Sequence, residues 1–142
     1  MQQGNDKDMG WWVCQRFKCQ DQKHLTIITA YQVSQKSTQS VRMDTAFMQQ
    51  WSFLNTQQVD PVNPRVQFWQ DLSAKMQQFQ EEGDKIILMV DANSDFDDVQ
   101  FLQMDTKHKL LDLHSNLTSL TPPPESYGRR KKKINFILGL LA

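Results

Sequence analysis

The stretch that most constrains the fold is an apolar run with an abrupt polar end, Lys85-Ile86-Ile87-Leu88-Met89-Val90-Asp91-Ala92-Asn93. A short run rich in Ile and Val is typical of a strand buried on both faces, so we expect a central β-strand here. Its polar end predicts that Asp91 and Asn93 lie at the carboxyl edge of a sheet, where α/β proteins tend to form their sites. An ordinary acidic turn after a central strand fits the same pattern, and this segment alone leaves both interpretations open.

The other apolar patterns predict strands and helices distributed along the chain. Residues 10–19, 25–31 and 134–138 are expected to form strands, because they mix β-branched and aromatic residues. A helix is expected to begin at Asp44 as its N-cap and to carry Phe47, Met48, Trp51 and Leu54. Strands with intervening amphipathic helices predict an α/β layered domain.

The best-defined helix is predicted between Asn63 and Gly83. Asn63 suits the N-cap, Pro64 the first helical position, and Gly83 the carboxyl-terminal stop. The apolar residues between them recur at helical spacing, namely Val66, Trp69, Leu72, Met76 and Phe79. We expect this face to pack against a sheet rather than to bind a ligand. A shorter helix is predicted over about residues 98–107.

Composition indicates a folded intracellular domain. The chain has 142 residues, and its four Trp and eight Phe are poor material for a disordered segment. No apolar run approaches the roughly 20 residues that span a bilayer, and the polar amino terminus does not resemble a signal peptide. The two cysteines, Cys14 and Cys19, lie outside any zinc-binding pattern and are expected to be reduced. We therefore expect a cytoplasmic or nuclear location.

The formal net charge of zero conceals two segregated blocks of charge. Residues 91–98 contain four acidic side chains, whereas a continuous basic run is formed by Arg129, Arg130, Lys131, Lys132 and Lys133. Such a run suits the backbone of a nucleic acid, to which it would bind through salt-sensitive contacts. A nuclear localisation patch or a solvated loop fits it as well.

Four segments, taken in order, resemble one known family. They are residues 26–31, residues 86–93, residues 110–113, and Pro124-Glu125-Ser126-Tyr127 followed by Ile134-Asn135-Phe136-Ile137. Their order and spacing resemble the endonuclease/exonuclease/phosphatase superfamily of DNase I-like, metal-dependent phosphoesterases. Within it, the chain is most similar to endonuclease-like domains associated with retroelements and reverse transcriptases. The resemblance implies the central and C-terminal part of a DNase I-like layered α/β sandwich, with residues 1–9 as a polar tail and 10–142 as a partial domain.

The resemblance implies roles for three residues. Asp91 matches the Asp of a Gly-Asp-x-Asn motif that orients or deprotonates the attacking water, and Asn93 matches its partner, which holds a phosphate oxygen. Tyr31 matches a strand-end Tyr that contacts the scissile phosphate, although an edge aromatic with its hydroxyl in water fits it equally. The resemblance also implies Mg²⁺ as cofactor and nucleic acid as substrate, with the basic run as a nucleic-acid-binding segment.

The departures from the family pattern are as informative as the matches. Asn135 stands where the family has an Asp that orients a catalytic His, and an amide does not stabilise imidazolium as a carboxylate does. No Ser-Asp-His segment occurs in the chain, and the metal-binding Glu lies upstream of the matched region in the family. His24, His108 and His114 lie in no matching context and are expected at the surface.

These observations predict a Mg²⁺-dependent phosphodiester hydrolase domain, related to endonucleases, that is incomplete or inactive as it stands. Two alternatives stay open. One is a non-catalytic remnant that binds nucleic acid, which the Asn at position 135 favours. The other is a phosphatase of the same fold that acts on lipid or inositol phosphates, since these ligands are anionic as well.

Overall fold

The structure, a computed structural model, describes residues 9–20, 22–34, 45–60, 63–93, 99–113, 116 and 135–140. They form five strands and three helices: β1 (Trp12–Lys18), β2 (His24–Tyr31), α1 (Ala46–Thr56), α2 (Pro64–Glu81), β3 (Lys85–Asp91), α3 (Val99–His108), β4 (Leu111–Asp112) and β5 (Asn135–Leu140). The predicted strands and helices are therefore present, with ends that differ by a few residues. None of the described helices is long and apolar enough to cross a membrane.

The strands make one mixed sheet in the order β1-β2-β3-β5-β4. β1 and β2 form an antiparallel hairpin, and β2 then pairs with β3 in parallel. β5 is antiparallel to both β3 and β4. The predicted central strand is therefore central, since β3 lies between β2 and β5. The α/β fold class is confirmed.

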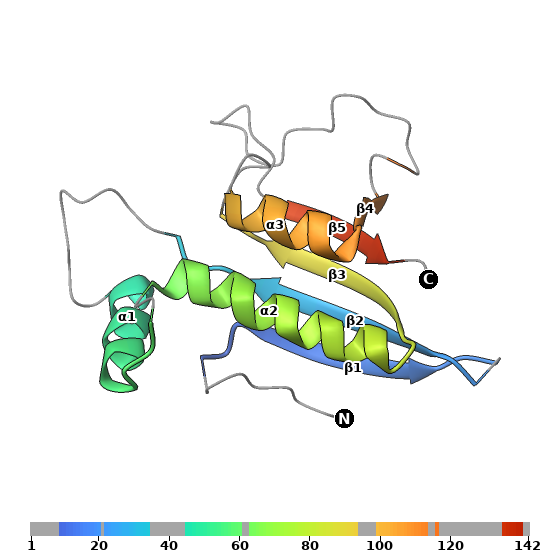
Figure 1. The fold of residues 1–142 in the computed structure, drawn as a ribbon, viewed down its shortest axis with the longest axis horizontal. Coiled ribbons are helices and arrows are strands. Elements are labelled where there is room, and N and C mark those ends of the chain that lie inside the picture. Colours follow the sequence, from blue (N-terminus) through green and yellow to red (C-terminus); the bar gives the residue numbers. More distant parts are fainter. Residues whose placement is uncertain are drawn as a thin grey trace.

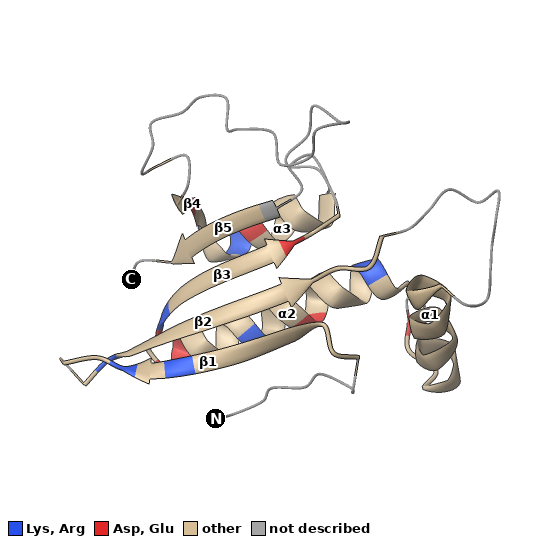
Figure 2. Cartoon of the chain, turned by 180° about the vertical axis from the view of Figure 1, so that it is seen from behind, with Lys and Arg blue, Asp and Glu red and all other residues tan. Residues whose placement is uncertain are grey.

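The described helices α2 and α3 lie side by side on one face of the sheet, and the opposite face carries neither (Figures 1 and 2). The prediction that the central strand is buried on both faces is therefore wrong. Burial alternates along β3: Ile86, Leu88 and Val90 are buried beneath the helices, whereas Met89 is 36% exposed on the open face. A run of apolar residues does not show which face of a strand a helix covers, because the residues on both faces are apolar.

Helix α2 has the ends that its sequence predicts. The side chain of Asn63 accepts a hydrogen bond from the backbone N–H of Arg65 at 3.0 Å, and Pro64 occupies the first turn. After Glu81, the chain reverses through Gly83, whose φ of +79° is one that a side chain rarely adopts. The predicted apolar face packs on the sheet as expected, although Val66 at its edge is only half-buried.

A chain of aromatic contacts joins the helix layer to the sheet. Phe68, which the spacing argument omitted, is fully buried between Trp11 and Trp69, with ring centroids 5.9 and 4.8 Å away. Trp69 in turn contacts Phe101 of α3 at 5.6 Å, and Phe101 stacks on Phe136 of β5 at 4.7 Å. Edge-to-face and stacked pairs of this kind add to the free energy gained by burying each ring.

Helix α1 corrects one detail of the prediction. Its N-cap is Thr45, whose hydroxyl accepts a hydrogen bond from the backbone N–H of Met48, rather than Asp44, which lies outside the described residues. Thr and Asp are both favoured at the N-cap, so the residue types alone did not show which of these two adjacent residues caps the helix. Leu54 of the predicted apolar set is fully buried, while Trp51 is 37% exposed.

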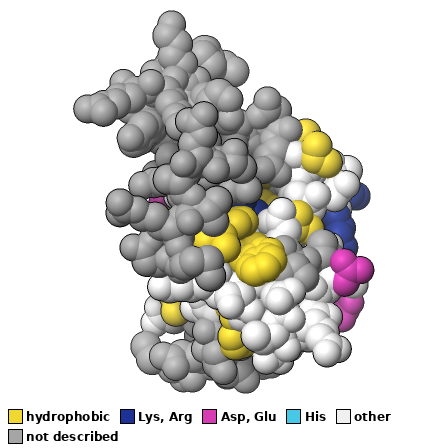
Figure 3. Space-filling view, turned by 90° about the vertical axis from the view of Figure 1, so that its left-hand side faces the viewer, with side chains coloured by type: hydrophobic (Ala, Val, Ile, Leu, Met, Phe, Trp, Pro, Cys, Tyr) yellow, Lys and Arg dark blue, Asp and Glu magenta, His cyan; other side chains and the backbone are white. Residues whose placement is uncertain are grey.

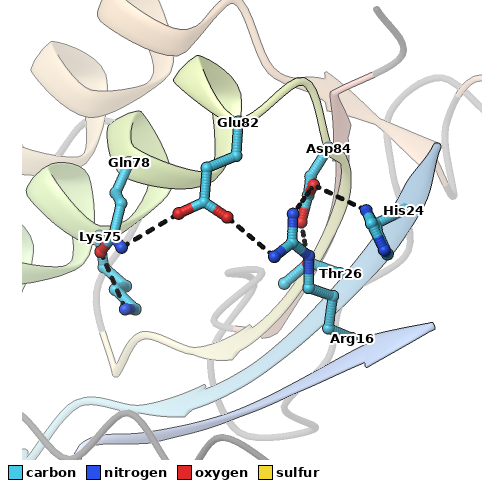
Figure 4. Close-up of polar contacts among 7 residues, drawn as sticks. All are labelled: Arg16, His24, Thr26, Lys75, Gln78, Glu82 and Asp84. Carbon is cyan, nitrogen blue, oxygen red and sulfur yellow. Dashed lines mark hydrogen bonds and ion pairs between the residues drawn. The ribbon is translucent and has the colours of Figure 1, made fainter. Parts of the chain in front are cut away.

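At the amino-terminal end of β3, a buried carboxylate links neighbouring elements of the fold. Asp84 accepts hydrogen bonds from Arg16 and Thr26, each at 2.6 Å, and its side chain is fully buried (Figure 4). Arg16 also pairs with Glu82 at 2.9 Å, at the end of α2. The hydrogen bond with Asp84 raises the pKa of Arg16 above its ordinary value. This network links β1, β2 and the α2–β3 turn.

The three histidines were expected at the surface, and for His108 this is wrong. His108 is only 2% exposed, because the last turn of α3 places it against α2. His24 is half-buried near Asp84, and His114 lies outside the described residues.

Replacing Phe68 by Ala is expected to destabilise the fold by about 3–5 kcal/mol, because the ring is fully buried and packs against Trp11 and Trp69. Urea unfolding followed by tryptophan fluorescence measures this change. Phe53→Ala is the matched control, since Phe53 is 37% exposed on α1 and its loss should cost less than about 1 kcal/mol. Equal effects of the two substitutions would contradict the assigned core.

Candidate functional site

Three of the predicted site residues occupy one row across the sheet. Tyr31 is the partner of Asp91 in the β2–β3 pair, and Asp91 is the partner of Asn135 in the β3–β5 pair. We call these three residues the strand-end row. Neighbouring strands lie about 4.8 Å apart, so the row spans only about 10 Å. Because β2 and β3 run in parallel, their carboxyl ends meet at this edge, as the sequence predicted.

The side chain of Asp91 has an unused acceptor. It is half-buried, yet its Oδ1 atom is buried and has no hydrogen-bond partner among the described residues. A buried acceptor without a partner costs about 1–3 kcal/mol relative to one that is hydrogen-bonded. An oxygen in that state is well suited to accept a proton or a hydrogen bond from a ligand. Tyr31 beside it is 51% exposed, so its phenol is accessible from solvent.

Asn93 makes a structural hydrogen bond in addition to the phosphate contact that the family resemblance implies for it. Its amide Nδ2 donates to the backbone carbonyl of Gln32 at 2.6 Å, and the backbone N–H of Gln32 donates to the backbone carbonyl of Asp91 at 2.8 Å. Its φ of +46° lies in the left-handed region, which Asn tolerates better than most residues. Asn93 thus joins the segments that follow β2 and β3.

Arg65 is the residue at this edge that sequence reasoning missed. Its guanidinium donates to the backbone carbonyls of Val33 at 3.0 Å and Asn93 at 3.3 Å. The side chain of Gln32, in turn, donates to the Arg65 carbonyl at 3.1 Å. One feature of the sequence could have indicated Arg65. A cation in the first turn of a helix interacts unfavourably with the helix dipole, which suggests that its side chain has a hydrogen-bond acceptor outside the helix. Its partners follow two different strands and become neighbours only in the folded chain.

The described surface near this end carries few charged side chains. Seen from the end at which α1 lies, exposed apolar side chains of the described surface lie next to white, uncharged atoms, and most of the visible charged side chains lie at one margin (Figure 3). The predicted nucleic-acid-binding run from Arg129 to Lys133 lies outside the described residues, as do residues 94–98. The contribution of both blocks of charge to this site remains a prediction.

The donor set does not by itself fit a magnesium site held by the protein. Within the described ranges, no group of three His, Cys, Asp or Glu side chains lies together. Among the described residues, Asp91 supplies one carboxylate with an unpartnered oxygen, so waters and substrate phosphates would have to provide the other ligands of a Mg²⁺ ion. We therefore derive no catalytic step through a metal ion.

The arrangement of the sheet and helices matches a known catalytic domain. It is similar to the catalytic domain of human Nocturnin, solved with a bound sulfate anion, with a TM-score of 0.58 and 12% sequence identity. The chain has a DNase I-like α/β fold. The match covers 91% of this chain and 40% of the Nocturnin chain, so the chain spans less than half of that domain. No protein-family model and no curated protein matches the sequence.

The likeness confirms the fold that the family resemblance implied. At 12% identity it carries no information about which residues act. The roles of Tyr31, Asp91, Asn93 and Asn135 therefore depend on the geometry described above.

Asn93→Asp is expected to destabilise the protein by about 1–3 kcal/mol, because a carboxylate cannot donate to the Gln32 carbonyl. The free energy of unfolding in urea tests this. Asn116→Asp, at an exposed position, is the control and should change stability by less than about 0.5 kcal/mol. A tolerated Asn93→Asp would show that this hydrogen bond does not hold the two segments together.

Proposed function

We propose that the strand-end row is the phosphodiester-recognition site of a DNase I-like hydrolase domain, with nucleic acid as substrate and magnesium as cofactor. The observation that carries this proposal is Asp91 Oδ1, which has no hydrogen-bond partner among the described residues, in a residue that pairs with the exposed Tyr31 at the carboxyl edge of two parallel strands. Its dependence on magnesium and its preference for nucleic acid rest on the family resemblance. The retroelement-associated subtype rests on the same resemblance.

The two side chains have complementary chemistry. The Tyr31 hydroxyl would donate a hydrogen bond to a non-bridging phosphate oxygen. The Asp91 carboxylate would accept a hydrogen bond from the attacking water and orient it in line with the leaving oxygen. Phosphoryl transfer depends mainly on such positioning and on charge stabilisation. Sulfate is a tetrahedral oxyanion like phosphate, so its presence in the Nocturnin structure supports oxyanion binding by this fold.

Asn135 limits what the row would do in this chain. It is paired with Asp91, at the position where the family resemblance expects a second carboxylate. An amide neither accepts a proton at neutral pH nor compensates a positive charge on a nearby imidazolium. We therefore propose that the 142-residue chain recognises a phosphodiester but does not turn it over. This favours the non-catalytic remnant over the phosphatase acting on lipid or inositol phosphates.

Plasmid nicking in the presence of Mg²⁺ tests the catalytic part of the proposal. The chain is expected to nick supercoiled plasmid no faster than Asp91→Ala, because the row lacks a second carboxylate. Nicking clearly above that control would contradict the inactive assignment and would establish a complete hydrolase.

Binding of a short fluorescent oligonucleotide tests the recognition part. Tyr31→Phe is expected to weaken binding about two- to tenfold, the range for one lost hydrogen bond to the phosphate. Ser52→Ala on the exposed face of α1 is the control and should bind as the original chain does. Absence of binding, or the same affinity after Tyr31→Phe, would contradict the proposal that the strand-end row binds a phosphodiester. An inositol phosphate that competes better than the oligonucleotide would favour the phosphatase alternative.

A further inference from the structure

A second polar cluster lies in the helix layer, between α2 and α3, which run side by side (Figure 1). His108 Nε2 is 2.8 Å from Ser73 Oγ, and His108 Nδ1 is 2.5 Å from Gln80 Oε1. With the amide oxygen of Gln80 facing it, Nδ1 must carry the ring proton, since that oxygen only accepts. Nε2 then presents its lone pair to the Ser73 hydroxyl. This is the order of hydrogen bonds in which a histidine removes a proton from a nucleophilic serine.

The surroundings keep His108 ready to accept that proton. Burial lowers the pKa of His108 below its ordinary value of 6.5, and the charge of Lys107 lowers it further, while a hydrogen bond to the Ser73 backbone opposes both. The lowered pKa favours the neutral ring, which is the form that accepts a proton. The groups of α2 that face it, Ser73 and Gln80, are uncharged. Lys107 also donates to Ser73 Oγ at 3.3 Å, which favours negative charge on that oxygen.

A cavity of about 160 Å³ adjoins the serine, with Ser73, Trp69, Met104, Gln103 and Lys107 among its lining residues. Trp69 is 2% exposed, and its indole N–H is buried without a hydrogen-bond partner among the described residues. It precedes Ser73 by four residues on α2, so the two side chains lie on the same helix face. An unpartnered donor one turn from a nucleophile is a candidate to stabilise the oxyanion of acyl transfer.

We propose that Ser73 is the nucleophile of a second, separate site that hydrolyses esters of short carboxylic acids. Ser73 Oγ forms a bond to the acyl carbon as its proton passes to His108 Nε2, and the ester C–O bond breaks as the alcohol leaves with that proton. Water then gives a proton to His108 and its hydroxyl to the acyl group, which releases the acid and restores Ser73. Gln80 is a positioning residue, because it holds the tautomer of His108. The net reaction consumes one ester and one water.

The first test uses the full chain with two probes, p-nitrophenyl acetate and a fluorophosphonate. The fluorophosphonate is expected to modify Ser73, as located by mass spectrometry, with loss of fluoride. Ser73→Ala should lower both ester hydrolysis and labelling at least tenfold, while the matched Ser52→Ala on α1 should leave both unchanged. Labelling confined to other residues, or hydrolysis unaffected by Ser73→Ala, would overturn the proposal.

The second test separates catalysis from a merely structural hydrogen bond. The rate of Ser73 labelling should rise with pH and then level off, with a midpoint below 6.5, since burial lowers the pKa of His108 from that value. Gln80→Glu keeps an acceptor for Nδ1–H and adds a negative charge, so it should move the midpoint of this profile to higher pH. A midpoint that does not move, or a rate that rises steadily without a plateau, would show that His108 does not act on Ser73.

Discussion

The parallel pairing of β2 with β3 is the constraint on which the rest of the structure depends. It joins strands from distant parts of the chain and aligns seven residue pairs, from Leu25 with Lys85 to Tyr31 with Asp91. A slip of one residue would turn every side chain of a strand to the other face and separate Tyr31 from Asp91. The hairpin strand β1 on one side and β5 on the other extend this pair, and α2 covers the face on which Ile28, Leu88 and Val90 are buried.

The two faces of the sheet have different surroundings, and this difference places the two proposed sites. The helix-covered face carries the aromatic chain through Phe68 and Phe101, and the contact of His108 with Ser73 lies between the two helices of that layer. Tyr31 points to the open face, together with the exposed side chains of Val13 and Met89. A ligand of the strand-end row would therefore approach from the side of the sheet that lacks the described helices.

The carboxylates at the two ends of β3 differ in their hydrogen-bond partners. Asp84 before the strand is buried with Arg16 and Thr26 as donors, and a fully paired buried charge of this kind holds neighbouring elements together. Asp91 at the other end has a buried oxygen without a partner in the described part of the chain. Folding alone gains nothing from leaving such an acceptor unpaired, so the contrast supports the proposal that Asp91 binds a ligand, whereas the contacts of Asp84 are structural.

The sequence by itself determined the fold class, the extent of α2 and the position of the central strand, because apolar periodicity and helix ends depend on nearby residues. The polar end of the central strand also indicated Asp91 and Asn93, whereas Tyr31 was indicated by the family resemblance. Only the tertiary structure decided which face of β3 is open, that Asn93 and Arg65 join two strand ends, and that His108 is buried against Ser73. These outcomes require contacts between residues 28 to 61 positions apart, and no local pattern specifies such contacts.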